Sequence, residues 1–177
     1  MRAFDDLPLE TLEEACGELH RRVAVAIRYI GEERADEQDE SRRSPRQRVA
    51  SLAVLLELTA QTFAAVAAGT SPPSGRVDRH PAAVAAVMYG SPTLTGLLQR
   101  LEQDRRMLAS LARGLESRLD TPSNGAWPGL SLRQVLSEVT IVAAAECAHA
   151  LEAVLRRWDE EEQRALEAAR ERGEADV

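Results

Sequence analysis

Helix-start and helix-stop signals divide this chain into long segments, and each segment has the apolar periodicity of an amphipathic helix. Capping serines stand at three of the expected starts, two of them directly before a proline: Ser44, Ser91 and Ser131. Glycines, or a loop rich in proline and glycine, stand at the expected ends: Gly69, Gly90 and residues 120–129. These signals predict four long helices over residues 8–31, 45–68, 92–119 and 131–172, and a short helix over 81–89 between the second and third.

The composition also favours helices. Alanine, leucine, arginine and glutamate dominate, and aromatic residues make up only 3% of the chain. Sheets depend on β-branched and aromatic side chains, so we expect an all-α protein without strands. A chain of 177 residues is long enough to bury one core. We therefore predict a single domain over residues 1–172, a four-helix bundle with one short extra helix, and a disordered tail over 173–177.

Charge and hydropathy narrow the function classes. The formal net charge is −7 and the pI is near 5.1, whereas a nucleic-acid binder needs a basic face for phosphate contacts. The most apolar stretch, residues 49–68, contains Glu57 near its middle, so we expect no membrane span. The first ten residues lack the apolar segment of a secretion signal, and all 22 basic residues are arginine, as in proteins from GC-rich bacteria. We expect a cytoplasmic bacterial protein.

A cluster of four arginines follows the first expected helix: Arg42, Arg43, Arg46 and Arg48. Six carboxylates precede or accompany it between residues 32 and 40. We expect these charges to balance one another rather than to bind a phosphate backbone.

A glutamate interrupts the apolar stripe of the fourth helix. At 100° per residue, Glu146 falls on the stripe formed by Leu132, Val135, Leu136, Val139, Ala143, Cys147, Ala150 and Val154. An unpaired buried carboxylate costs several kcal/mol, so Glu146 needs a partner. Arg105 interrupts the leucine stripe of the third helix in the same way, and both residues lie about 22 Å from the turn between the helices. We predict a buried, two-pronged Arg105–Glu146 pair.

A second polar contact is expected at a similar level. His20 and Glu57 lie at matched heights on the first and second helices. We therefore predict one or two structural polar layers across the middle of the bundle, formed by Arg105, Glu146, Glu57 and His20.

The alternative interpretation is a metal site. His149 follows Glu146 by three residues, and this Glu-x-x-His spacing resembles that of ferritin-like di-iron bundles. Trp127 and residues 132–136 resemble a helix opening in DinB-type metal bundles. These resemblances imply Glu57, Glu146 and His149 as ligands for Fe, Mn or Zn. The other ligands of both families are missing, because the three histidines are scattered over three segments and two helices lack an inward carboxylate. Our first expectation is therefore no metal and no cofactor.

The fourth helix carries a second apolar patch away from its main stripe: Ile141, Ala144, Leu151 and Leu155. One bundle core cannot easily cover both faces, so this patch needs another element or a partner. We expect a homodimer that buries it together with Met88 and Tyr89 of the short helix. The expected function is non-catalytic, helix-mediated association with a second copy or another protein.

Overall fold

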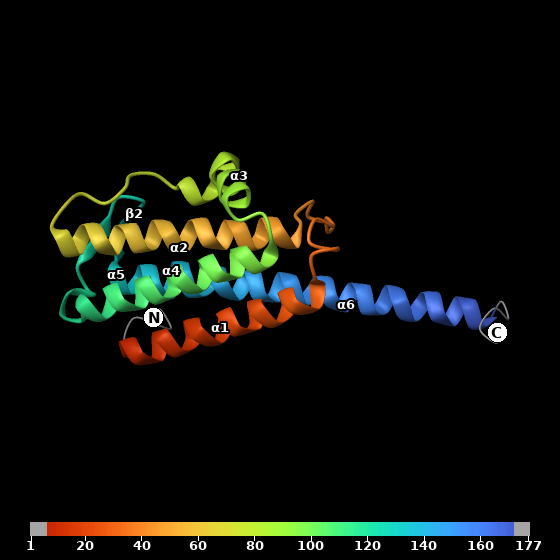
Figure 1. The fold of residues 1–177 in the computed structure, drawn as a ribbon. Coiled ribbons are helices and arrows are strands. Elements are labelled where there is room, and N and C mark those ends of the chain that lie inside the picture. Colours follow the sequence, from red (N-terminus) through yellow and green to blue (C-terminus); the bar gives the residue numbers. More distant parts are fainter. Residues whose placement is uncertain (1–6, 172–177) are drawn as a thin grey trace.

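The computed structural model of the chain describes residues 7–171, and the protein is 74% helical, which confirms the all-α class. Its long helices are α1 (Leu9–Ile30), α2 (Pro45–Ala68), α4 (Leu94–Gly114) and α6 (Val142–Glu171). Both α1 and α2 pack against α4 and α6, and α3 (Pro81–Gly90) packs on the outer side of α2 (Figure 1). The tail expected over residues 173–177 lies outside the described residues.

The expected capping serines begin two of the helices. Ser44 accepts a hydrogen bond from the backbone N–H of Gln47, whose side chain in turn accepts one from the Ser44 N–H. Ser131 and Gln134 form the same reciprocal pair. The third expected start is displaced by two residues, because Thr93 rather than Ser91 caps α4. Short 3₁₀ turns, η1 (Val77–Arg79) and η2 (Glu116–Arg118), precede α3 and follow α4.

The fourth predicted helix contains a π-helical segment that changes its register. It begins as α5 (Leu132–Gln134), passes through the π-helix η3 (Val135–Ile141), and continues as α6. A π-helical turn closes from residue i to i+5 and so holds one residue more than an α-helical turn. One extra residue rotates everything that follows by about 100°. The apolar stripe of α6 is therefore displaced from the one expected for an uninterrupted helix.

This rotation buries the second apolar patch, while Cys147 and Val154 of the expected stripe remain buried and Glu146 does not. Ile141, Ala144 and Leu151 are 7%, 0% and 0% exposed, because they pack into the core beneath α1. Leu155 is half-buried against the same core, whereas Glu146 is exposed. The prediction that the patch of Ile141, Ala144, Leu151 and Leu155 is left for a partner is wrong, since the same chain covers it.

A small antiparallel sheet, which the sequence analysis did not expect, joins α4 to α5. It pairs β1 (Pro122–Asn124) with β2 (Trp127–Ser131). Asn124 and Gly125 both have positive φ values, 53° and 57°, as in the turns that close two-stranded hairpins. A Cβ at Gly125 would lie 2.5 Å from the Pro73 carbonyl oxygen, so the hairpin tip packs tightly on the α2–α3 connection.

Helix α2 is the central element of the core. Its buried side chains include Leu56, Leu58 and Phe63, and they face α4, α6 and α3. Of the described helices, α2 alone is long and apolar enough to cross a membrane, and 72% of its most apolar window is buried inside the protein. Burial in a protein core produces the same composition, so this helix by itself is weak evidence for a membrane span.

Candidate functional site

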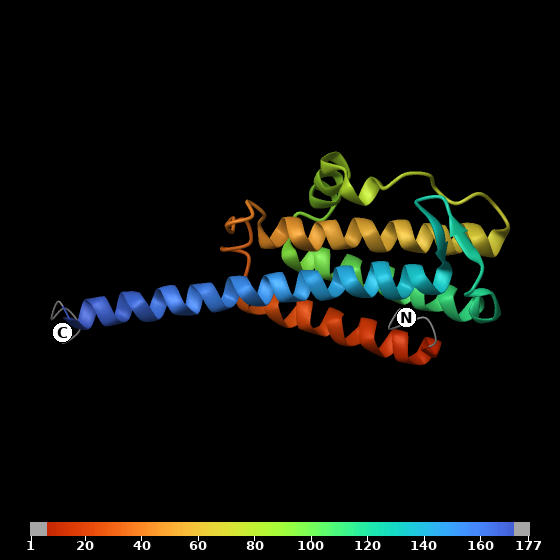
Figure 2. The same cartoon turned by 180° about the vertical axis from the view of Figure 1, so that it is seen from behind.

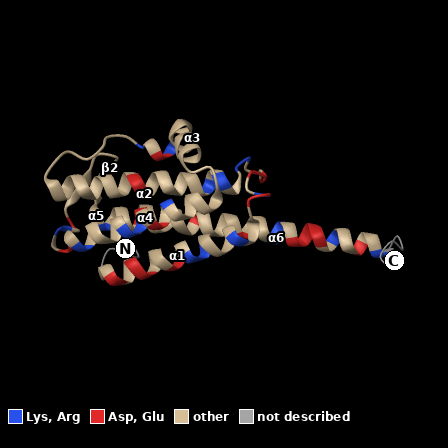
Figure 3. Cartoon of the chain, in the orientation of Figure 1, with Lys and Arg blue, Asp and Glu red and all other residues tan. Residues whose placement is uncertain are grey.

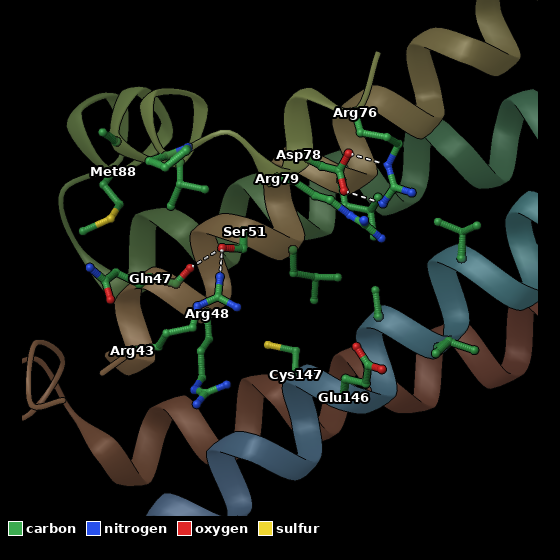
Figure 4. Close-up of a pocket in the computed structure, with 18 of the residues that line it drawn as sticks. Arg43, Gln47, Arg48, Ser51, Arg76, Asp78, Arg79, Met88, Glu146 and Cys147 are labelled. Atoms are coloured by element: carbon green, nitrogen blue, oxygen red, sulfur yellow. Dashed lines mark hydrogen bonds and ion pairs between the residues drawn. The ribbon is translucent and has the colours of Figure 1, made fainter. Parts of the chain in front are cut away.

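A large open groove runs between α2, α3 and the η3–α6 helix. Its volume is about 1490 Å³. Leu52 and Leu55 of α2 form part of its apolar surface, Val139 and Val142 of the η3–α6 helix face them, and the α3 side carries Val84, Met88 and Tyr89. Figure 4 shows Glu146 and Cys147 on the α6 wall and Arg76, Asp78 and Arg79 across from them. The groove is thus apolar inside and charged along its margins.

Arginines dominate those margins. Five arginines line the groove, namely Arg42, Arg43, Arg48, Arg76 and Arg79, against three carboxylates, Asp78, Glu138 and Glu146. This local excess of positive charge occurs on a chain whose net charge is −7. The groove is therefore a basic strip on an acidic protein.

Three of these arginines have no ion-pair partner in the described part of the chain. Arg42, Arg43 and Arg79 are exposed, and none of them lies within ion-pair distance of a carboxylate there. The Arg43 guanidinium instead donates a 2.7 Å hydrogen bond to the Ser51 hydroxyl, which donates to the Gln47 carbonyl oxygen. That bond holds Arg43 against the α2 wall.

The remaining arginines form ion pairs. Arg46 and Arg48 pair with carboxylates of residues 32–40, as expected, whereas the pair of Arg76 was not predicted. Arg48 forms an ion pair with Asp39, and Arg46, just outside the groove, pairs with Asp36 and Glu32. Arg76 makes a two-pronged contact with Asp78, at 2.8 and 2.7 Å, while its guanidinium lies 5.5 Å from the centre of the Trp127 ring. These pairs fix the walls on which the unpaired arginines stand.

Cys147 is the one thiol in the groove lining, and it is not set up as a nucleophile. Burial raises the pKa of the Cys147 thiol to about 12, and the nearby Arg48 and Arg43 guanidiniums oppose this effect only in part. The thiol therefore stays protonated at neutral pH. Cys147 acts as a small apolar side chain of the groove floor.

The predicted Arg105–Glu146 pair does not form. Arg105 binds Glu102 on its own helix, with nitrogen–oxygen distances of 2.9 and 2.8 Å, and lies against Gly17 of α1. Glu146 is exposed in the groove, because the π-helical turn rotates it away from α4. The two side chains belong to different faces of the molecule.

The second predicted contact does not form either. Glu57 is half-buried and accepts a 2.6 Å hydrogen bond from Arg100 of α4. His20 is buried, with Nδ1 2.7 Å from the Cys16 carbonyl oxygen, so this nitrogen carries the proton and donates. Burial lowers the pKa of His20, and the nearby Arg105 lowers it further, so the ring is neutral at physiological pH. His20 is buried as expected, but it contacts its own helix rather than Glu57.

The alternative metal ligands are not brought together. Glu57 is engaged by Arg100, Glu146 lines the groove, and His149 is exposed one turn further along α6. No group of three metal-ligating side chains assembles within residues 7–171. The structure therefore gives no support to a site for Fe, Mn or Zn formed by Glu57, Glu146 and His149.

Asp104 is the buried carboxylate that the sequence analysis missed. It is 8% exposed, and its Oδ2 atom is buried without a hydrogen-bond partner in the described chain. Burial raises the pKa of Asp104 to about 6, although Arg100 works in the opposite direction. The burial of Asp104 could have been predicted from the spacing of its neighbours. Leu97, Leu101 and Leu108 lie on the same face of the helix as residue 104.

Arg79 was not predicted as a site residue, and Met88 and Tyr89 were predicted at a different surface. The sequence analysis placed Met88 and Tyr89 at an interface with the patch on the fourth helix, and the structure instead places both in the groove lining. Tyr89 is 91% exposed. No protein-family model, curated protein or solved structure matches this chain.

Proposed function

We propose that this protein is a non-catalytic association domain, a four-helix bundle that uses the groove between α2, α3 and α6 to bind an acidic amphipathic helix of a protein partner. The observation that carries the proposal is the set of guanidiniums without an ion pair among residues 7–171, those of Arg42, Arg43 and Arg79, around an apolar-floored groove. The packing of α1 and α2 against α4 and α6 supports the bundle description.

A helix suits the shape and chemistry of this groove. An α-helix with its side chains is about 10–12 Å across, and one laid in the groove would meet Leu52, Leu55 and Val142 with its apolar face. Its acidic flank would then meet Arg42 and Arg43 at the start of α2 and Arg79 before α3, whereas the α6 wall carries Glu138 and Glu146. Exposed charge pairs of this kind contribute about 0.2–1 kcal/mol each and mainly direct orientation and encounter.

A protein partner is favoured over nucleic acid. Asp78, Glu138 and Glu146 stand among the arginines of the lining, and the whole chain is strongly acidic. A phosphate backbone needs a continuous basic surface, which this mixed lining does not provide. We also propose that the protein resides in the bacterial cytoplasm, where its cysteines, both free, would stay reduced.

The test uses full-length protein and a fluorescently labelled, designed helical peptide with leucines on one face and glutamates on the other. The groove-reversed variant carries Arg42→Glu, Arg43→Glu and Arg79→Glu. The control variant reverses three exposed arginines on other surfaces: Arg21→Glu, Arg28→Glu and Arg106→Glu.

Fluorescence anisotropy should show saturable binding to the wild-type protein and the control variant. Binding by the groove-reversed variant should be at least about tenfold weaker, because 1.4 kcal/mol is already lost if each reversal costs about 0.5 kcal/mol. Equal affinity for the groove-reversed and wild-type proteins, or no saturable binding to the wild type, would refute the groove as the binding surface.

A further inference from the structure

We propose that the occupant of the groove is the acidic end of α6 from a second copy of this chain, exchanged reciprocally across a two-fold axis. This inference rests on the proposed function, since it names the partner of the same groove. The segment concerned, residues 159–170 of α6, is called the acidic extension below.

The acidic extension projects from the rest of the molecule. Trp158 is the last buried side chain of α6, and the Arg34 guanidinium lies 3.5 Å above the centre of its ring. Every residue from Asp159 to Glu167 is exposed. Figures 1 and 2 show this part of α6 continuing straight beyond the other helices. Residues 159–167 thus continue the 30-residue helix α6 with every side chain exposed, and their surface is available to another molecule.

The charges of the acidic extension complement those of the groove. The extension carries five carboxylates, Asp159, Glu160, Glu161, Glu162 and Glu167, against two arginines, Arg164 and Arg170. Figure 3 shows the acidic residues gathered just beyond the point where α6 leaves the body. In the groove the arginines outnumber the carboxylates, and three of them lack a partner in the described chain. The exposed acidic extension and the arginine-bearing groove are therefore of opposite charge.

The lengths and directions also agree. The acidic extension is about 17 Å long, and the groove wall from Glu138 to Cys147 runs for about 14 Å at 1.5 Å per residue. The extension leaves the body at the end where α2 begins, which is also the end that carries Arg42 and Arg43 (Figure 1). It points away from its own groove, so it can reach a groove only in another molecule.

A two-fold axis satisfies both copies at once. With the two α6 helices antiparallel, each acidic extension lies along the groove of the other copy, and the contact closes without leaving a free site. Leu166, 56% exposed, is the one large apolar side chain of the extension and would reach the apolar floor. With so little apolar area, the dimer should be weak and should dissociate when salt screens the charges.

A charge-swap experiment tests this arrangement. The tail-reversed variant carries Glu160→Arg, Glu161→Arg and Glu162→Arg. All three positions are exposed, and within the described residues only Glu161 forms an ion pair, with Arg157. The matched control carries the same change at three exposed glutamates elsewhere on the body, Glu10→Arg, Glu14→Arg and Glu116→Arg. Sedimentation velocity measures the mass of each protein alone and of the two reversed variants mixed.

We expect the wild type and the matched control to sediment as dimers at low salt, twice the 19.4 kDa chain mass. The groove-reversed and tail-reversed variants should each be monomers, since each pairs like charges. Their equimolar mixture should form a heterodimer, because an acidic groove then meets a basic extension and a basic groove meets an acidic one. A monomeric wild type, a dimer that survives either reversal, or a mixture that stays monomeric would overturn the inference.

Failure of this inference can be told apart from failure of the proposed function. The tail-reversed variant keeps an intact groove, so the designed acidic peptide can be titrated into it. Tight peptide binding together with a monomeric wild type would leave the groove as a binding surface and remove the second copy as its occupant. If the tail-reversed variant did not bind the peptide either, both the groove as a binding surface and the second copy as its occupant would be refuted. Because the altered glutamates are exposed and lie beyond Trp158, the body of the tail-reversed variant should stay folded, and its urea unfolding followed by circular dichroism should remain cooperative, as in the wild type.

Discussion

Asp104 should make the protein less stable at neutral pH than it would be with a neutral side chain there. The carboxyl is 8% exposed on α4, Oδ2 has no partner in the described chain, and the charged neighbours that bear on it are Arg100 and Glu57. Burial raises the pKa of Asp104 from 3.8 to about 6. The folded protein therefore holds this proton over a pH range in which the unfolded chain has released it. The stability associated with protonated Asp104 is fully present at low pH, and ionisation of this carboxyl removes it as the pH rises from about 4 to about 6.

The magnitude follows from the two pKa values. Each tenfold difference in acidity corresponds to about 1.4 kcal/mol, so the ionised Asp104 costs the fold about 3 kcal/mol above pH 6. The substitution Asp104→Asn keeps the shape and removes the ionisation. We expect Asp104→Asn to raise the free energy of unfolding, relative to wild type, by about 2–3 kcal/mol more at about pH 7.5 than at about pH 4. Urea denaturation followed by circular dichroism at the two pH values measures this difference.

Asp39→Asn is the control with the opposite sign. Burial works against the charge of Asp39, but hydrogen bonds from Ser41 and Arg48 outweigh it and hold the pKa near 2. Its stabilising contribution is present above about pH 4 and is lost as the pH falls toward 2, so Asp39→Asn should destabilise the protein at neutral pH by about 2 kcal/mol. If Asp104→Asn showed the same difference from wild type at both pH values, the description of Asp104 as a buried, unpaired carboxyl would be wrong.

Two further predictions concern packing, and both are measured by urea denaturation. Deleting Val139 should be tolerated, because it turns η3 into a regular α-helix without rotating α6. Deleting Ala153, in contrast, rotates Val154 and Trp158 out of the core. The Ala153 deletion should therefore lower the free energy of unfolding by at least about 3 kcal/mol more than the Val139 deletion. Phe63→Ala should cost about 3–5 kcal/mol, since this ring is fully buried. Equal losses from the two deletions would contradict the assigned register.

The helix starts could be predicted from the sequence because their signals are local. Ser44 with Gln47 and Ser131 with Gln134 satisfy the first backbone N–H groups within one turn, whatever the rest of the chain does. The hairpin also had a local signal, since Asn124–Gly125 favours a tight turn between two short strands. The overall composition did not indicate the hairpin, because its two strands contain only three and five residues.

The π-helical turn is the feature that sequence periodicity could not supply. Helical wheels assume a constant 100° per residue, so one additional residue between Val135 and Ile141 moved Glu146 to the core and Leu151 to the surface in the prediction. The Thr140 hydroxyl donates to the Val135 carbonyl oxygen five residues earlier, and this contact follows the wider turn. The choice between α- and π-helical turns depends on packing against α1 and α2, which the local sequence does not encode.

The groove was hidden from sequence analysis for a related reason. Its arginines come from residues 42–48, around the start of α2, and from residues 76–79, just before α3. These segments are 28 positions apart in the sequence, and α3 brings them together by packing on α2. Only Arg42, Arg43 and Arg48 were noticed as a cluster, and they were expected to be neutralised nearby. The structure confirms that expectation for Arg48 but not for Arg43.

Hydrogen–deuterium exchange of residues 159–170 tests the central claim most directly. A helix that projects alone into water should exchange its amide hydrogens almost at the rate of an unfolded chain, whereas one docked in a groove is protected. We predict protection of this segment in the wild type at low salt, and loss of that protection in the groove-reversed variant while α2 and α4 remain protected. Rapid, unprotected exchange of residues 159–170 in the wild type, or protection that survives reversal of Arg42, Arg43 and Arg79, would contradict the account.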